Sequence, residues 1–579
     1  MVKFFIPSVS YSDAITGSRK SKWIPRLFVL PLIAYIIFRC FETELTNFII
    51  PFFPDEPDKS FGFYHDFLRL CFHEMLWLSF FLLTAWVLTV HVPISQVVSR
   101  MENHVLKKAS LYTTGMVCLS LVTTFLIAYF TLHAFPNSAD EYVYLYQAET
   151  LSQGKLTQQA HPLGDFFRFN HIAQKDGISV GRFPPGWPLL LSLPFFLAVP
   201  PLWLNPILGT ISLLVFYNFV KRYYSPRVAI WSLATLAFTA YYLFNSASFF
   251  SHTSCLLFTV AFVYCLHRNH ENPSGIYTFL AGVFLGMVVV TRYYTAVLIF
   301  LPVLVSLIYQ HHWKAFKPLF FIGLGSLPFF ILLCWYNLEI TGDPLLPVTA
   351  WADRTETLGF VKGHSFMKGM EHFIRRFLLF LYWSSPSLLL LYFVFLYQKI
   401  RHKAQRYSVP EDYYMILLII GYFFYHHLGG NQYGPRFLFE AYPFVIVFVI
   451  NQAFKMKAKW PLALLVAGMV YAVVKLPYIM EREHRVVHER LDLYTQVRKA
   501  GVHNAVILIS TNTGIIRPMP VRDLTRNGMD HSGEIIYAQD QGEKNTELMK
   551  FYANRSFYKY IRDPERVGGR LVRMRSTGY

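Results

Sequence analysis

Long apolar runs separated by short polar segments dominate this chain, and they predict helices that cross a membrane. We expect thirteen spans, at residues 27–49, 68–90, 111–134, 203–219, 228–245, 252–267, 275–290, 294–310, 318–336, 377–397, 412–429, 437–453 and 461–477. Several runs are close to the roughly 17-residue lower limit for a helix that crosses the hydrocarbon core. Only residues 291–293 separate the runs 275–290 and 294–310, so this pair could be miscounted.

The loops between the predicted spans alternate in charge, and this alternation predicts the orientation in the membrane. One set is short and basic, with lysines and arginines in residues 100–108, 221–227, 314–317, 399–406 and 455–459. Basic loops favour the cytoplasmic side, so we place this set and the N-terminus in the cytoplasm. The long loops 135–185 and 337–376 then lie outside, and an odd number of spans puts the C-terminus outside as well. We expect a multi-pass protein of a bacterial inner or plasma membrane.

The composition agrees with a bilayer environment and excludes other classes of protein. Hydrophobic residues make up 54% of the 579 residues. Charged residues make up 15%, against roughly 25% in soluble domains, which excludes a disordered chain, a coiled coil and an ordinary cytosolic enzyme. The net charge of +18 fits basic residues that face anionic headgroups. No zinc-finger spacing or RNA-binding signature accompanies it, so we expect membrane lipids as partners and no nucleic acid.

Residues 479–579 differ from the rest, because their apolar runs are shorter. The pattern predicts a helix at about 482–500, strands at 504–509, 534–539 and 556–561, and a helix at 543–553. Buried strands that alternate with helices are typical of a small α/β domain. The predicted fold class is therefore an all-α polytopic membrane protein with a small extracytoplasmic α/β domain. We divide the chain into residues 1–110 with two extra spans, a membrane domain at 111–478, and the C-terminal domain at 479–579.

The first long outer loop, 135–185, contains the densest polar and aromatic cluster. Asp140 and Glu141 directly follow a predicted span. A carboxylate at the membrane–water boundary can be partly desolvated and can accept a proton. The same two acids could instead only cap the start of a helix. The loop ends in Arg182-Phe183-Pro184-Pro185-Gly186 and a short apolar run, which predicts a segment that dips into the outer leaflet and lines a cavity.

Three arginines from separate segments are expected near the outer boundary: Arg182, Arg292 and Arg436. A single arginine at the end of a span often only extends to the lipid headgroups. Three at one level favour convergence on a phosphate, because the guanidinium group binds phosphate oxygens bidentately.

These segments resemble the GT-C superfamily of integral-membrane glycosyltransferases. The resemblance rests on "DEYVYLYQAETLSQGKL", "GRFPPGWPLLL", "TRYYTA", "YNLEITGDPL" and "YGPRFLFEAYPF", which occur in the expected order over roughly residues 111–480. The nearest groups are the protein O-mannosyltransferase type, the lipid A aminoarabinose transferase type and their uncharacterised bacterial relatives. The resemblance implies that a sugar is taken from a polyprenyl-phosphate carrier on the outer face.

The resemblance also implies roles for individual residues. Asp140 matches the candidate general base, and Glu141 is its neighbour. Arg182 and Arg292 match the region that holds the carrier phosphate. With them we group Arg436 and two tyrosines of the same motifs, Tyr293 and Tyr433, as candidates for binding the donor phosphate or its lipid.

The chain departs from the family pattern at two positions. Many relatives carry a second aspartate where this chain has Ser251-His252-Thr253, and the aminoarabinose type carries a lysine before the Pro-Pro, where this chain has Arg182-Phe183. The first departure weakens the case for a metal. We therefore expect no cofactor, although a divalent metal stays possible.

Several other polar residues could have either a structural or a functional role. His252, His426 and His427 are candidates for supporting the site, as is Asp343, which first suggests a turn. Glu74, next to His73 inside a predicted span, could be functional or could form a bond between helices. His484 and His488 have no evident third metal ligand.

The predicted function is a membrane glycosyltransferase that moves a sugar from a polyprenyl-phosphate carrier to an envelope acceptor on the extracytoplasmic face. A carboxylate that accepts the hydroxyl proton and arginines that stabilise the leaving phosphate suit direct displacement at the anomeric carbon. The alternative is a transporter or flippase of lipid-linked glycans without catalysis, which would need a charged, water-filled path through the bilayer midplane.

Overall fold

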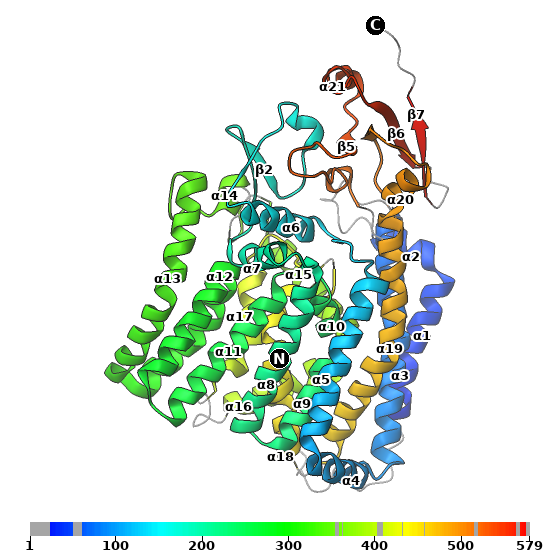
Figure 1. The fold of residues 1–579 in the computed structure, drawn as a ribbon. Coiled ribbons are helices and arrows are strands. Elements are labelled where there is room, and N and C mark those ends of the chain that lie inside the picture. The colour runs from blue at the N-terminus through cyan, green and yellow to red at the C-terminus, as the bar shows by residue number, and fades with distance from the viewer. Residues whose placement is uncertain are drawn as a thin grey trace.

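The computed structural model describes residues 24–49, 61–353, 358–361, 363–401, 409–430, 432–456, 458–513, 519–562 and 568–574. The predicted cytoplasmic segment before residue 24, and parts of the predicted basic loops at 399–406 and 455–459, lie outside these residues. A large body of helices is joined at one end to a smaller α/β unit (Figure 1).

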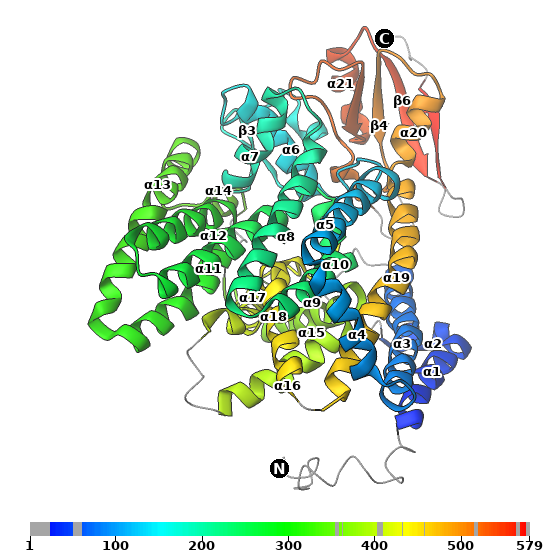
Figure 2. The same cartoon turned by 60° about the horizontal axis from the view of Figure 1, so that its bottom comes forward.

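The N-terminal helices pack against one side of the body. They are α1 (Ile24–Cys40), α2 (Glu42–Ile49), α3 (Phe61–Val90) and α4 (Ile94–Lys107). The long α3 lies beside α19, and α4 lies at the opposite end of the body from the α/β unit (Figures 1 and 2).

The helical body contains the main hydrophobic core. Its helices are α5 (Ala109–Leu126), the π-helix η3 (Ile127–Thr131), α8 (Leu204–Tyr223), α9 (Pro226–Ala237), α10 (Ala240–Ser246), α11 (His252–Glu271), α12 (Gly275–His311), α13 (Phe316–Thr341), α14 (Val348–Ala352), α15 (Phe366–Trp383), α16 (Pro386–Arg401), α17 (Tyr414–Phe423), α18 (Tyr442–Lys455) and α19 (Trp460–Arg490). Short 3-10 turns join several of them, among them η5 (Pro201–Trp203), η6 (His312–Ala315), η8 (Pro410–Tyr413) and η9 (Arg436–Ala441).

The described residues contain six helices that are long and apolar enough to cross a membrane, or seven if the bent pair α9 and α10 is one span. Several predicted spans are divided in the structure. The run 27–49 breaks between α1 and α2, and the run 377–397 breaks after Trp383. The count of thirteen spans therefore stays a prediction, because short apolar helices inside a large protein do not each need to cross the bilayer.

The runs 275–290 and 294–310 both belong to α12, which breaks at Arg292 (φ −151°, ψ 72°). The first half of α12 packs against α13. Glycines of α12 contact residues of α13 in three places: Gly275 at Phe321, Gly282 at Ile322, and Gly286 at Phe329. Residue numbers thus increase in the same direction along the first half of α12 and along α13. Because α13 follows α12 after only four residues, the second half of α12 must run back, and the chain reverses at Arg292.

Glycine makes the contact between these helices possible. A Cβ atom on Gly282 would overlap the carbonyl of Ile322, and one on Gly325 would overlap the carbonyl of Phe279. Small residues let helix backbones approach closely in membranes. The tight packing of α12 on α13 therefore fixes the level at which the chain turns at Arg292.

The loop predicted at 135–185 folds over one end of the body. It contains α6 (Ala139–Ser152), β1 (Gln158–Gln159), η4 (Gly164–Phe167), β2 (Ile172–Lys175) and β3 (Ile178–Gly181). The three strands form an antiparallel sheet in the order β1-β3-β2. The short apolar helix α7 (Gly186–Phe196) follows, and Trp187 donates a hydrogen bond to the Phe249 carbonyl at 2.8 Å. This helix is shorter than those that could cross a bilayer, and the predicted dip into the outer leaflet stays a prediction.

The C-terminal unit is an α/β fold, as the pattern predicts. It contains α20 (Asp492–Lys499), β4 (Ala505–Ile509), η10 (Val521–Asp523), β5 (Ile535–Gln539), η11 (Gly542–Lys544), α21 (Asn545–Phe551), β6 (Ser556–Arg562) and β7 (Gly569–Arg573). The sheet order is β5-β4-β6-β7, parallel except for β7. The predicted helix at 482–500 is divided between the end of α19 and α20.

The loop and the C-terminal unit share a hydrophobic core. Phe166 and Phe167 of η4 are 2% and 3% exposed, and they pack with Val506, Leu508 and other apolar residues of the C-terminal sheet. Tyr142 of α6 also donates a hydrogen bond to the Asn527 carbonyl at 2.9 Å. The C-terminal unit is therefore fixed to the loop that carries Asp140.

Candidate active site

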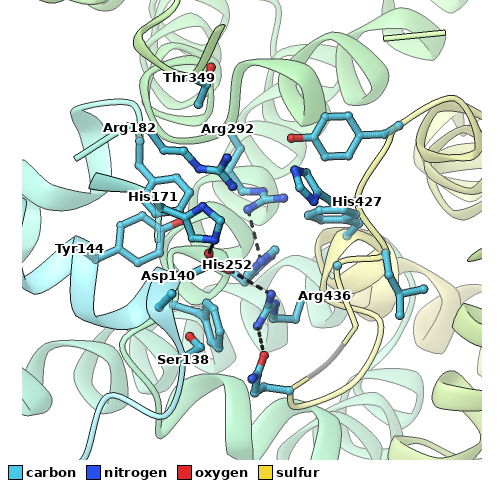
Figure 3. Close-up of a pocket in the computed structure, with 18 of the residues that line it drawn as sticks. Ser138, Asp140, Tyr144, His171, Arg182, His252, Arg292, Thr349, His427 and Arg436 are labelled. Atoms are coloured by element: carbon cyan, nitrogen blue, oxygen red, sulfur yellow. Dashed lines mark hydrogen bonds and ion pairs between the residues drawn. The ribbon is translucent and has the colours of Figure 1, made fainter. Parts of the chain in front are cut away.

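A cavity of about 540 Å³ lies under α6, where the loop, the helical body and the C-terminal unit meet. Figure 3 shows Asp140 and His171 on one side and three arginines that point into the same space. The arginines are Arg182 from the loop before α7, Arg292 from the reversal in α12, and Arg436 from the start of η9. The structure thus brings together one predicted carboxylate and all three predicted arginines.

Asp140 lies in the first turn of α6, which begins because Ser138 caps it. The Ser138 hydroxyl accepts a hydrogen bond from the Glu141 backbone N–H at 3.2 Å. The Asp140 carboxylate contacts Arg436 Nη2 at 3.2 Å and His171 Nε2 at 3.3 Å, and its side chain is 25% exposed. Asp140 therefore faces the cavity with both oxygens close to basic groups.

Burial and charge act in opposite directions on the Asp140 pKa. Burial raises it, but the nearby basic groups His171, Arg436 and Arg182 lower it further than burial raises it. The pKa of Asp140 is therefore below its ordinary value, and this carboxyl is ionised at neutral pH.

Arg292 is held from several sides. Its Nη1 lies 3.2 Å from His252 Nε2, and its Nε lies 3.6 Å from Glu440 Oε1. His252 Nδ1 lies 3.1 Å from the same Glu440 oxygen, and Glu440 is fully buried. Glu440 thus positions both Arg292 and His252 from behind the wall of the cavity.

Arg436 is fixed by an aromatic ring as well as by Asp140. Its guanidinium lies 3.7 Å from the centre of the Phe250 ring, and Nη1 donates to Gln432 Oε1 at 3.3 Å. Cation–π contacts of this kind hold the plane of the guanidinium. Arg436 therefore has a set orientation between Asp140 and the rest of the cavity.

Positive charge exceeds negative charge on the described lining of the cavity. Its charged residues are Arg182, Arg292, Arg436, Arg490, Asp140 and Asp523. Asp523 comes from the C-terminal unit and accepts a hydrogen bond from Asn170 at 2.5 Å. Burial raises the Asp523 pKa to about 6. Four guanidinium groups against two carboxyls make the cavity suited to an anion.

An apolar cavity of about 320 Å³ adjoins the charged one. It lies between α12 and α13 and is lined mainly by apolar residues, among them Val289, Val297, Phe330 and Leu333. The two cavities share Arg182, Pro184, Tyr293, Pro347 and Thr349. An apolar chain with an anionic end could therefore lie along both.

The other predicted residues fall into two groups. Tyr293, His252 and His427 line the charged cavity, and Tyr293 contacts the Thr349 hydroxyl at 3.1 Å. Four predicted residues are not on its lining: Glu141, Tyr433, His426 and Asp343. Asp343 is an exposed turn residue after α13, where its carboxylate accepts a hydrogen bond from the Leu345 N–H at 2.9 Å.

Glu141 points into the protein although it follows Asp140 directly. One oxygen accepts a hydrogen bond from the Phe249 N–H at 3.1 Å, and the other from the Ser138 hydroxyl at 3.2 Å. Glu141 is 1% exposed, and burial raises its pKa to about 7. Its contacts support α6 and the turn before α11, while the side chain that caps α6 is Ser138, so the alternative that the two acids only cap a helix does not describe Glu141.

Sequence analysis missed three polar groups of this site. His171 contacts Asp140, Glu440 holds Arg292, and Asn170 binds Asp523. Asn170 and His171 belong to the outer loop but stand in no motif that suggests chemistry. Glu440 is part of "YGPRFLFEAYPF" and lies four residues after Arg436, a spacing that could have drawn attention to it.

No group of three or more histidine, cysteine, aspartate or glutamate residues is arranged to hold a metal ion in the described parts of the chain. His484 does have a neighbour that the sequence did not suggest, because His133 Nε2 lies 3.1 Å from its Nδ1. A divalent metal stays without support.

Comparisons with known proteins found one family model and several solved structures that are similar to this chain. A family model described as dolichyl-phosphate-mannose-protein mannosyltransferase matches residues 188–335. ArnT from Cupriavidus metallidurans, solved with undecaprenyl phosphate, is 11% identical with a TM-score of 0.50, over 78% of this chain and 93% of that chain. AglB from Archaeoglobus fulgidus, solved with an inhibitory peptide and a dolichol-phosphate, is 10% identical with a TM-score of 0.43, over 68% and 58%. The likeness to ArnT shows a shared fold. No curated protein sequence matches the chain.

Proposed function

We propose that this chain is a member of the GT-C superfamily of integral-membrane glycosyltransferases and that it transfers a sugar from a polyprenyl-phosphate carrier to an envelope acceptor. The observation that carries the proposal is the excess of guanidinium groups in a cavity that opens into an apolar one. A polyprenyl phosphate has the matching chemistry, an anionic head on an apolar chain. The structure of ArnT, which was solved with undecaprenyl phosphate, supports the same class of donor.

The donor phosphate would lie among Arg182, Arg292 and Arg436. Guanidinium groups bind phosphate oxygens bidentately and keep their charge at all relevant pH values. The prenyl chain would extend past Tyr293 between α12 and α13, where the cavity lining is apolar. The sugar would then stand close to Asp140, on the side of the phosphate away from the lipid.

In the transfer step, an acceptor hydroxyl attacks the anomeric carbon of the sugar. The bond from this carbon to the phosphate oxygen breaks, and the polyprenyl phosphate leaves with the electron pair. The hydroxyl proton passes to Asp140, which acts as general base. A base step of this kind contributes typically 10²–10⁴-fold in rate, and the arginines stabilise the charge that grows on the leaving phosphate.

Donor binding would also prepare Asp140 for this role. Arg436 and Arg182 help to lower its pKa, and a group with a low pKa is a weak proton acceptor. A bound phosphate shares these positive charges, so the pKa of Asp140 rises towards its ordinary value. The carboxylate becomes a stronger base when the donor is in place.

The test uses the full-length protein in lipid nanodiscs with polyprenyl-phosphate sugars that are labelled in the sugar. Binding of unlabelled polyprenyl phosphate is measured first, and then envelope material is added and the label is followed. We expect saturable binding and Asp140-dependent transfer of label from the carrier. Proteoliposomes that move the labelled lipid across the bilayer but transfer no sugar would support the flippase alternative and overturn the enzyme.

A further inference from the structure

A second large cavity adjoins the charged one and shares part of its lining. It has a volume of about 920 Å³ and lies between residues 160–177 of the outer loop and the C-terminal unit. We call this cavity the polar basin. It shares His171, Arg182 and His427 with the charged cavity, and only Arg182 with the apolar one. The apolar cavity and the polar basin therefore both reach Arg182, which lies close to Asp140 in the charged cavity.

The lining of the polar basin is rich in both signs of charge. Its acidic residues are Asp165, Asp176, Asp353 and Glu547. Its basic residues, apart from histidines, are Arg168, Lys175, Arg182, Arg522 and Lys544. Amide groups of Asn170 and Gln174 also line it. The basin thus offers many donors and acceptors of hydrogen bonds but almost no net charge.

The end of the basin next to Asp140 is built from the loop and the C-terminal unit together. Asn170 of the loop donates to Asp523 of the C-terminal unit, and the next residue, His171, contacts Asp140 at 3.3 Å. Asp523 and His171 both line the charged cavity. His171, which lines both cavities, therefore connects the basin to Asp140.

We propose that the polar basin is the acceptor site, and that the group it accepts is the hydroxyl-rich part of a glycan. This inference rests on the proposed function, because it needs a donor in the charged cavity. Carboxylates, amides and guanidinium groups hydrogen-bond the hydroxyls of a sugar, and a near-neutral lining does not require a charged ligand. The C-terminal unit then supplies one wall of the acceptor site.

A lipid chain does not fit this lining. Its two phenylalanines, Phe166 and Phe169, are 2% and 6% exposed, because they are packed in hydrophobic clusters. The apolar residues that remain on the lining, such as Leu163 and Ile172, are interspersed with charged ones, and an acyl chain would have to displace water from these charged groups. The apolar cavity between α12 and α13 provides for the one lipid chain that the donor carries.

A peptide acceptor is a weaker match. Peptides are usually recognised through pockets for alternate side chains or by pairing with an open strand edge. The described lining of the basin carries nine charged side chains of both signs besides its histidines, and its apolar members, such as Leu163 and Ile172, are few. A glycan needs only this dense supply of polar groups.

The experiment adds a bulky side chain at the far rim of the basin and uses a matched control. Lys544 lies on the C-terminal unit, is exposed and lines the basin; Lys550 is exposed on the same unit, six residues further along, and does not line it. The full-length wild type, Lys544→Trp and Lys550→Trp are placed in nanodiscs with a labelled polyprenyl-phosphate sugar and envelope material. Products are separated into organic-soluble lipid, protease-sensitive protein and protease-resistant water-soluble glycan, and binding of unlabelled polyprenyl phosphate is measured in parallel.

We expect the wild type and Lys550→Trp to place label in the protease-resistant glycan fraction. Lys544→Trp should reduce this transfer at least tenfold while its binding of polyprenyl phosphate is unchanged. Label in the lipid or protein fraction would overturn the glycan acceptor but leave the proposed function standing. Equal transfer by both tryptophan variants would overturn the basin as the acceptor site. A wild type that binds no polyprenyl phosphate, or transfers label to no fraction, would instead remove the proposed function, and this inference with it.

Discussion

Two carboxylates in this chain are held by basic side chains from distant segments, and their surroundings differ. Asp140 in α6 pairs with Arg436, is 25% exposed, and faces a cavity where further arginines meet. Glu74 in α3 pairs with Lys475 in α19 at 2.5 Å. Lys475 is 1% exposed and also donates to the Tyr471 hydroxyl at 2.8 Å. The cluster around Asp140 is open to the cavity and has more guanidinium groups than carboxylates. The pair of Glu74 and Lys475 is largely buried and has one charge of each sign.

Exposure and charge balance distinguish an ion pair that belongs to a binding site from one that only joins helices in a membrane protein. A buried pair with matched charges joins helices: Glu74 Oε2 of α3 accepts from both Lys475 and Tyr471 of α19. An open cluster in which guanidinium groups outnumber carboxylates is suited to an anionic ligand. Of the two interpretations of Glu74, the structure therefore favours a bond between helices, whereas we propose that Asp140 and the arginines form a functional site.

The largest expected effect is on the buried pair of Glu74 and Lys475. Lys475→Ala leaves Glu74 without its cation in a buried position, so it should lower the free energy of unfolding by about 3–5 kcal/mol. Binding of polyprenyl phosphate per folded molecule should be unchanged. The double variant Glu74→Leu/Lys475→Met, which removes both charges, should recover most of the stability in thermal denaturation. A loss of lipid binding in the folded fraction would contradict the structural role.

The next effect is on turnover at the open site. Asp140→Asn keeps the shape of the side chain but cannot accept a proton, so transfer should fall about 10²-fold or more while lipid binding persists. Asp343→Asn, at an exposed turn outside the cavity, is the matched control and should transfer at the wild-type rate. If Asp140→Asn only lowers the melting temperature and keeps full turnover per folded molecule, Asp140 caps α6 and is not the base.

A smaller effect is expected on donor affinity. Arg292→Ala removes one of the guanidinium groups that would hold the phosphate, and affinity for polyprenyl phosphate should fall about tenfold, since one charge-assisted hydrogen bond contributes roughly 1.5–3 kcal/mol. Arg268→Ala, at the opposite end of α11 from His252, should bind normally. Unchanged affinity in a well-folded Arg292→Ala protein would leave Arg292 with only a structural role beside Glu440.

The smallest effect concerns Glu141 and depends on pH. Its pKa of about 7 in the folded protein is above the ordinary value, so the folded state favours the protonated form. At a pH below the pKa that Glu141 has in the unfolded chain, the carboxyl is protonated in both states and the free energy of unfolding is unaffected. As the pH rises towards 7, the carboxyl ionises in the unfolded chain but not in the folded protein, and this lowers the free energy of unfolding. Glu141→Gln should therefore stabilise the protein by about 1 kcal/mol more at pH 6 than at pH 5. Melting temperatures across this range test it, and a difference independent of pH would contradict the buried, protonated carboxyl.

The spacing of apolar residues along the chain was sufficient to predict the coarse architecture. The apolar runs predicted the helical body, and the shorter runs after 500 predicted β4, β5 and β6 within one residue of their observed bounds. Local motifs also identified Asp140 and the three arginines of the cavity. These features depend on residues close in sequence, because helix and strand patterns repeat over a few positions.

Other features depended on contacts between distant segments. Asp140 and Glu141 are adjacent and chemically alike, yet one faces the cavity and the other the protein interior, because successive helical residues point in directions about 100° apart. His171, Glu440 and Asp523 joined the site only when the loop, η9 and the C-terminal unit packed together. The sequence by itself predicted the bilayer environment, and it determined the C-terminal α/β unit and which segments carry the candidate chemistry. Only the tertiary structure decided which side chains share a cavity, because that depends on packing between residues hundreds of positions apart.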